Sequence, residues 1–135
     1  MSTEENKGMI HRFWNEVSKG NLDIWDELCA PGYIYHGPAG DMTREQSKQH
    51  AAGILSTFSD FKCTIYDIVA EGDRVANRYI MRGTHRGAYG GIAPTGKQVE
   101  ISGIEIDRIA DGKFAETWGI SDTFVLMRQL GTFSQ

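Results

Sequence analysis

The carboxylate of Asp122 is the side chain of this sequence that we first expect to transfer protons. It follows an alternating stretch that contains Trp118 and Ile120, so the three side chains should point to one face of a strand. In a water-poor cavity a carboxylate is poorly solvated when charged, and its pKa rises toward the range useful for acid–base catalysis. Aspartate is also a favoured helix N-cap, here for the segment 123–130, and the residues alone leave both roles open.

Two histidines are candidates for contact with a substrate. His36 ends a short predicted strand, and His50 lies on the apolar side of a helix that is predicted to begin after Thr43. Gln46, three residues after Thr43, completes a capping box and supports this helix start. A histidine in a pocket wall can hold a substrate oxygen, whereas a hydrogen-bonded imidazole of the core or rim is the alternative for both residues.

Other kinds of catalytic site have no signature in the sequence. A Gly-rich phosphate loop, zinc-ligand spacing and a Gly-x-Ser-x-Gly elbow are all missing, so we expect no metal and no cofactor. Cys29 and Cys63 have no adjacent His or basic context, and we expect buried free thiols in a cytoplasmic protein. A formal charge of −4 with scattered Lys and Arg gives no basic surface for nucleic acid or membrane, and no apolar stretch is long enough to span a bilayer.

A long β-hairpin positions Asp122. The segments 97–109 and 113–122 alternate around Asp111-Gly112, where the turn could contain two residues or three. The three-residue turn, with Gly112 as a bulge, brings the apolar set onto one face, which contains Ile104, Ile106, Phe114, Trp118 and Ile120. We therefore predict this turn, and we expect that face to be the covered one. Arg108, Glu116 and Asp122 would share it, and the outer face would carry Glu105, Thr117 and Ser121.

Helices precede the strands along the chain. Apolar spacing predicts a helix at 4–18, a short one after Asn21 and a third after Thr43, followed by strands at 62–69 and 74–85. This order indicates one α+β domain, residues 1–135, with helices on one face of an antiparallel sheet. The alternation in 74–85 does not settle which face lines a pocket. The Gly-rich segment 87–96 is predicted to be a mobile loop, either a gate or a plain connection.

Several different short motifs follow one another in order along the chain: Val75-Ala76 with Arg78, then 83–87, 94–97, 108–114, 116–118, Asp122 and 129–131. Their order and spacing resemble the SnoaL-like polyketide cyclase (ester cyclase) family, and the resemblance covers nearly the whole chain. The resemblance implies the nuclear transport factor 2-like fold, a cone-shaped barrel in which N-terminal helices pack on a curved antiparallel sheet and enclose one pocket.

The resemblance also implies a function. It implies a commonly dimeric, cofactor-free enzyme that closes a ring by intramolecular aldol condensation, and the carboxylate after the Trp-containing strand is the acid/base, here Asp122. Characterised cyclases pair this carboxylate with a histidine of the neighbouring strand. In this chain that strand offers Glu100, Ser102 and Ile104 instead.

We therefore predict a homodimeric lyase or isomerase that cyclises or isomerises an apolar carbonyl compound by acid–base catalysis. The residues predicted to bind the substrate are Trp118, His36, His50, Arg78, Ile104 and Phe114. A non-catalytic module that uses the same cavity for small-molecule binding, or that serves dimerisation, is the alternative.

Overall fold

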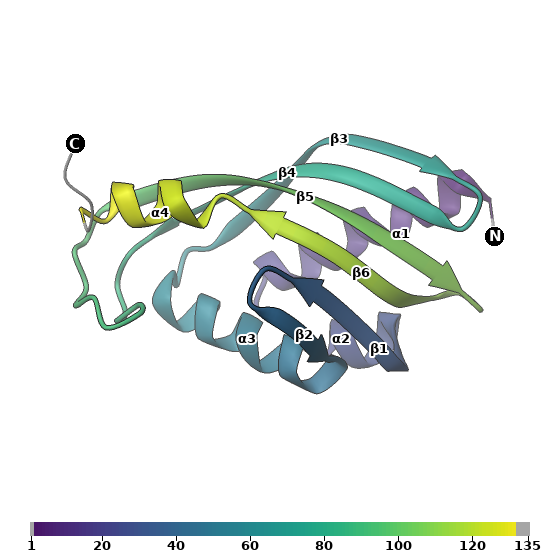
Figure 1. Cartoon of the computed structure of the whole chain (residues 1–135), viewed down its shortest axis with the longest axis horizontal. Helices are drawn as coiled ribbons and strands as arrows, with labels where there is room; N and C mark the ends of the chain where they lie inside the picture. Colours follow the sequence, from purple (N-terminus) through teal and green to yellow (C-terminus); the bar gives the residue numbers. More distant parts are fainter. Residues whose placement is uncertain (1, 132–135) are drawn as a thin grey trace.

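A computed structural model describes residues 2–131 as helices packed on a single sheet (Figure 1). The helices are α1 (Thr3–Ser18), α2 (Ile24–Leu28), α3 (Arg44–Thr57) and α4 (Thr123–Gln129). The strands are β1 (Cys29–Gly37), β2 (Gly40–Thr43), β3 (Lys62–Glu71), β4 (Arg74–Thr84), β5 (Gln98–Ala110) and β6 (Lys113–Ser121). The short strand β2 was not predicted, and α2 begins after Asp23, whose side chain makes no capping hydrogen bond, rather than directly after Asn21.

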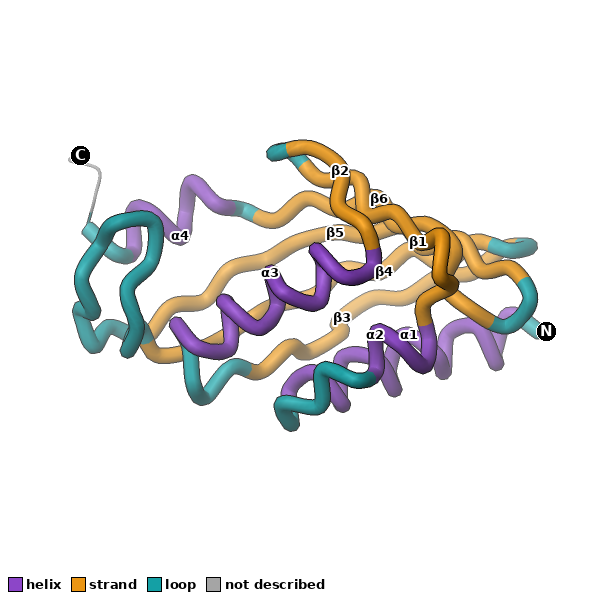
Figure 2. Tube along the Cα trace, turned by 90° about the horizontal axis from the view of Figure 1, so that it is seen from below, coloured by secondary structure: helices purple, strands orange, loops and turns teal. Residues whose placement is uncertain are grey.

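The six strands form one curved, open sheet in the order β2-β1-β6-β5-β4-β3. β1 and β6 run parallel, and the other neighbours are antiparallel. Helices α1, α2 and α3 lie on the concave side of the sheet (Figure 2). We call this side the inner face and the opposite side the outer face. The predicted α+β class, with helices packed on a curved sheet, is confirmed.

Local sequence signals account for where the main helices begin. Thr43 accepts a hydrogen bond from the Gln46 backbone N–H at 3.2 Å, and the Gln46 side chain accepts one from the Thr43 N–H at 2.9 Å. Ser2 and Glu5 form the same capping box on α1. Within the described residues, no helix combines the length and the apolar character that a membrane span requires.

The core lies between α1 and the sheet. One stripe of α1 is buried there, at the spacing expected for an amphipathic helix: Met9, Ile10, Phe13 and Val17. From the inner face, Val75 and Tyr79 of β4 are buried with exposed fractions of 0% and 3%. Full burial of side chains of this size stabilises the fold by about 1.5–3 kcal/mol each, so this layer anchors the helices over the sheet.

The turn between β5 and β6 differs from the prediction. Ala110 pairs with Lys113, and both intervening residues have positive φ, 53° at Asp111 and 75° at Gly112. This is a two-residue hairpin turn of the kind that Asp-Gly favours. The extra residue is Ala115, which bulges where Phe114 opposes Ile109 and Glu116 opposes Arg108.

The bulge changes which residues share a face. Four of the five apolar side chains do lie together, but on the outer face: Ile104, Ile106, Trp118 and Ile120. Only Phe114, which precedes the bulge, points inward. The predicted covered face was therefore wrong for the other four. The inner face instead carries Glu105, Asp107 and Thr117, so the predicted outer set of Glu105, Thr117 and Ser121 was wrong as well. Arg108 and Glu116 do pair, at 3.1 Å.

The facing of β4, which its alternation left open, follows from its packing against α1. Val75, Asn77 and Tyr79 are buried on the inner face. Arg78 is exposed on the outer face, where it forms an ion pair with Asp67 at 2.6 Å and lies over the Tyr66 ring. Arg78 therefore lies outside the cavity, because an arginine is readily solvated outside and would need a buried partner inside, and its predicted contact with a substrate remains a prediction.

Candidate functional site

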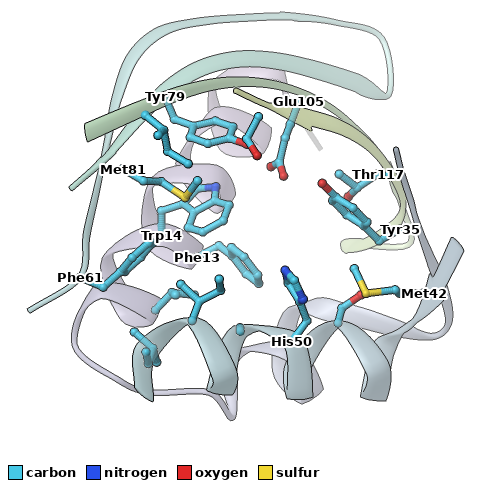
Figure 3. A pocket seen from close by; sticks show the side chains of 18 of the residues that line it. Phe13, Trp14, Tyr35, Met42, His50, Phe61, Tyr79, Met81, Glu105 and Thr117 are labelled. Atoms are coloured by element: carbon cyan, nitrogen blue, oxygen red, sulfur yellow. The ribbon is translucent and has the colours of Figure 1, made fainter. Parts of the chain in front are cut away.

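A cavity of about 590 Å³ lies between the inner face of the sheet and the helices. Most of its wall is apolar and aromatic, formed mainly by Phe13, Trp14, Phe58, Phe61, Tyr79 and Phe114 (Figure 3). Polar groups come chiefly from three strands: Tyr35 of β1, Glu105 and Asp107 of β5, and Thr117 of β6. An apolar wall with a few convergent polar groups is typical of a small-molecule site.

Two inward-facing glycines make room for this polar cluster. A Cβ atom on Gly119 would lie 2.6 Å from the Tyr35 hydroxyl oxygen and 3.1 Å from Glu105 Oε2. A Cβ atom on Gly103 would lie 2.3 Å from the Tyr79 hydroxyl oxygen. Glycine at these positions lets both phenols extend over the strands toward Glu105 (Figure 3).

Glu105 and Asp107 are two residues apart on β5 and are only 7% and 6% exposed. Burial raises the pKa of Glu105 well above its ordinary value, and the neighbouring charge of Asp107 raises it further. Burial also raises the pKa of Asp107, to about 7, although the hydrogen bond donated by the Thr117 hydroxyl opposes the shift. Burial thus favours the protonated form of both carboxyl groups, and the neighbouring Asp107 favours that of Glu105 further.

A neutral Glu105 can donate a hydrogen bond into the cavity. Among residues 2–131, none forms a hydrogen bond with its carboxyl group, so the proton is available to a bound molecule. Burial raises the pKa of Tyr35 to about 12 and raises that of Tyr79 as well, so both phenols are also protonated donors. The cluster can thus bind and protonate an oxygen that develops negative charge.

Asp122 lies at the junction of β6 and α4, outside the residues that line the cavity. Its side chain is exposed and accepts a hydrogen bond from the Val125 backbone N–H at 3.0 Å, which makes it the N-cap of α4. The expected position beside Trp118 in a covered cavity was wrong, because β6 ends at Ser121 and the chain turns into the helix. The catalytic role of Asp122 remains a prediction.

His36 and Trp118 stack on the outer face with ring centroids 5.3 Å apart. His36 contacts Glu116 at 2.6 Å through Nε2 and Asp41 at 2.9 Å through Nδ1, and these bonds raise its pKa, with Glu116 contributing most. Arg74 lies 5.0 Å from the centre of the Trp118 ring. The side chains of His36 and Trp118, like those of Ile104 and Arg78, do not line the cavity. Strands β1 and β6 present His36 and Trp118 to the outer face, beside the even-numbered residues of β5.

His50 and Phe114 do line the cavity. Phe114 packs edge-on against Phe13 with ring centroids 5.6 Å apart. The His50 ring projects from α3 into the open space (Figure 3). The structure thus brings these two predicted residues together with Glu105, and their contact with a substrate remains a prediction.

Sequence reasoning missed Glu105 and Asp107, although β5 contains a signal for them. Along the whole strand, the odd-numbered positions that share a face with Glu105 and Asp107 include the apolar residues Val99, Ile101 and Ile109. The even-numbered positions that share a face with Ile104 and Ile106 are mostly polar: Gln98, Glu100, Ser102 and Arg108. The two central isoleucines suggested the opposite facing. Because side chains two positions apart lie on the same face of a strand, the apolar ends indicate that Glu105 and Asp107 are on the buried face, where carboxyl groups with raised pKa values mark a candidate functional site.

The chain is similar to several known proteins. The model of the SnoaL-like polyketide cyclase family matches residues 8–130. AclR, a proposed hydroxylase from Streptomyces galilaeus, is 26% identical, with a TM-score of 0.92 over 98% of this chain and 100% of its own. IdmH, a proposed polyketide cyclase from Streptomyces antibioticus, is 31% identical, with a TM-score of 0.84 over 93% and 97%. A proposed polyketide cyclase from Acidithiobacillus ferrooxidans is 27% identical, with a TM-score of 0.86 over 99% and 100%. No curated protein matches at a significant level.

Proposed function

Because the chain belongs to the SnoaL-like polyketide cyclase family, we propose that it is a small-molecule enzyme in which Glu105 is the general acid. The reaction is an aldol-type cyclisation or an isomerisation of a carbonyl compound, which makes the enzyme a lyase or an isomerase. The observation that carries the proposal is a buried carboxyl group on the wall of an apolar cavity, without a hydrogen-bond partner among residues 2–131, whose pKa is raised by burial.

The acid acts on the carbonyl oxygen of the substrate. When the carbon next to a carbonyl loses a proton, negative charge moves to that oxygen, and a hydrogen bond from Glu105 stabilises it. Burial, and then the neighbouring Asp107, favour the protonated form of Glu105 before the reaction begins. The hydroxyl groups of Tyr35 and Tyr79, which extend toward the same carboxyl, are further donors for the oxygen.

The substrate is an apolar molecule with few polar groups. The aromatic wall offers faces and edges for packing against a flat ring system, and the cavity volume of about 590 Å³ falls in the range of small-molecule sites. Its carbonyl group binds at the sheet, where the polar cluster lies, and its apolar part binds against Phe13, Trp14 and Phe61 (Figure 3).

Isotope exchange on a simple ketone tests this proposal. 2-Tetralone is an apolar bicyclic ketone, and the exchange of its α-hydrogens in deuterated water is followed by NMR. Glu105→Gln keeps the shape of the side chain but removes the acidic proton, so the exchange rate should fall by about 10²–10⁴-fold. The matched control is Glu100→Gln, on the outer face of the same strand, where Glu100 pairs with Arg82 at 2.9 Å. Equal rates in wild type and Glu105→Gln would overturn the role of Glu105.

The same experiment addresses the alternative function. A non-catalytic binding module of this fold would bind 2-tetralone, measurable by calorimetry, without accelerating exchange. Binding without exchange in the wild-type protein would therefore favour the binding module over the enzyme.

We also propose a homodimer formed through the outer face. Ile104, Ile106 and Ile120 are 53%, 39% and 61% exposed there, beside the half-buried Trp118. Within the part of the chain that the structure describes, the helices α1, α2 and α3 cover only the opposite face. Contiguous exposed apolar side chains of this kind are typical of an interaction surface.

A further inference from the structure

We propose that His50 is the base that takes the proton from the carbon next to the substrate carbonyl, opposite the acid Glu105. This inference rests on the proposed function and adds a second catalytic group to it, one that comes from the helical wall rather than from the sheet. Three features of the structure carry it: the position of His50, the state of its ring nitrogens and the geometry that enolisation needs.

The first feature is the position of His50 on α3. The cavity-lining residues of this helix are Ser47, His50, Ala51, Ile54 and Leu55, which recur at helical spacing and so form one stripe. Within this stripe, His50 has the only side chain with a basic nitrogen. Its ring projects into the cavity from the wall opposite Glu105, and the space between the two side chains is open (Figure 3).

The second feature is that the His50 imidazole is free to react. No residue among 2–131 forms a hydrogen bond with either of its ring nitrogens. His36, by contrast, is held between Glu116 and Asp41, and His85 Nδ1 accepts a hydrogen bond from the Thr95 backbone N–H at 3.1 Å. His11 is exposed on α1, outside the cavity lining. Only His50 thus presents a free imidazole to the space where a substrate would bind.

The third feature is the arrangement of acid and base on different walls. A donor to a carbonyl oxygen lies near the plane of the carbonyl group, whereas the base must approach the α-hydrogen from above or below that plane. Glu105 and Asp107 extend from one strand and reach the substrate from the same side. One carboxylate oxygen of Asp107 is also already engaged, because it accepts the hydroxyl hydrogen of Thr117. A base on α3 meets the geometric requirement without competing for the acid's position.

The proton-transfer step balances with these two residues alone. The α-carbon–hydrogen bond breaks, and the proton passes to a nitrogen of His50. The electron pair of that bond forms the carbon–carbon double bond of the enol, while the carbonyl oxygen takes the proton of Glu105. The products are an enol, an imidazolium and a carboxylate. In deuterated water the imidazolium exchanges its proton for a deuteron. When the step then runs in reverse, the deuteron is transferred to the α-carbon, and NMR detects the labelled ketone.

Exchange of 2-tetralone hydrogens tests His50 with a matched control. His50→Gln keeps a polar side chain but has no basic nitrogen, so the exchange rate should fall by about 10²–10⁴-fold while affinity for the ketone and the thermal midpoint are retained. His11→Gln, the control, should exchange at the wild-type rate. His50→Ala leaves space for a small base, and added imidazole should restore its rate with saturation, which a merely structural role would not produce.

The outcomes separate this inference from the proposed function. Wild-type rates in His50→Gln, together with slow exchange in Glu105→Gln, would overturn the role of His50 and leave that of Glu105 intact. Failure of imidazole to restore a folded His50→Ala variant would also count against His50 as the base. A wild-type protein that binds 2-tetralone without exchanging it would overturn the proposed function and this inference together.

Discussion

The inner and outer faces of β5 differ sharply. Glu105 is 7% exposed inside the cavity, while its neighbour Ile104 is 53% exposed on the other side of the strand. Burying a carboxyl group costs free energy, and exposing an isoleucine forgoes the roughly 1.5–3 kcal/mol that its burial would contribute. Neither arrangement serves the stability of an isolated monomer.

The difference is consistent with the two roles proposed above. We propose that the inner face supplies a proton to a bound molecule, and Gly103 and Gly119 leave room for its polar groups. We propose that the outer face supplies apolar area for a second copy of the chain. If the two faces have these different roles, variants of either face should have separable effects.

The largest effect is expected on the outer face. Ile120→Lys places a charge where the proposed dimer would bury an apolar side chain, and burial of an unpaired charge costs several kcal/mol. Light scattering at micromolar concentration should therefore show a dimer for the wild type and a monomer for the variant. Lys62→Ala, an exposed substitution at the start of β3, is the control and should leave the dimer intact. A wild-type monomer would contradict the proposed interface.

The next effect concerns the inner face. In Gly103→Ala the added Cβ would lie 2.3 Å from the Tyr79 ring, which is buried and stacks with Trp14. Tyr79 cannot move without disturbing the core, so we expect a loss of about 1–3 kcal/mol in the free energy of unfolding, measured by urea denaturation. Gly8→Ala on α1 meets nothing within 4 Å and should instead stabilise the protein by about 0.5–1 kcal/mol. Equal stability of the two variants would show that the phenol is not confined.

The buried acids should also make stability depend on pH. Because the pKa values of Glu105 and Asp107 are raised in the folded state, the native protein keeps protons that the unfolded chain has already released. The contribution of Asp107 to the free energy of unfolding therefore falls as pH rises from about 4 to about 7, by up to about 1.4 kcal/mol per pH unit. The contribution of Glu105 also falls as pH rises above its ordinary pKa. The double variant Glu105→Gln, Asp107→Asn should show a flatter profile in urea denaturation. Parallel profiles would contradict the raised pKa values.

The smallest effect is expected at Asp122, which belongs to neither face. As an N-cap it should tolerate Asn, whereas Asp122→Ala should lose about 0.5–2 kcal/mol of stability. The exchange rate should then be unchanged in both variants. If Asp122→Asn instead slowed exchange by orders of magnitude at unchanged stability, the catalytic role implied by the family would be supported.

The sequence was sufficient for most of the helices and strands, although not for β2, and for the family. Helix starts follow from short-range capping, as at Thr43 and Gln46, and the Asp111-Gly112 hairpin follows from the conformational preference of two adjacent residues. These signals act within a few residues of the chain, so they can be read without knowing the rest of the fold. The α+β class followed from the order of the elements.

The facing of the hairpin and the composition of the site depended on tertiary structure. A single bulged residue, Ala115, makes Phe114 and Trp118 point to opposite faces of β6. The position of this bulge depends on how β6 pairs with both β5 and β1. Which side of the sheet is covered depends on where α1 and α3 pack. Alternation normally identifies the covered face by its apolar side chains, and it gives the wrong face where the covered side carries acids and the open side carries isoleucines. Glu105 and His50 are 55 positions apart in the sequence, and only the closure of α3 over the sheet brings them to one cavity.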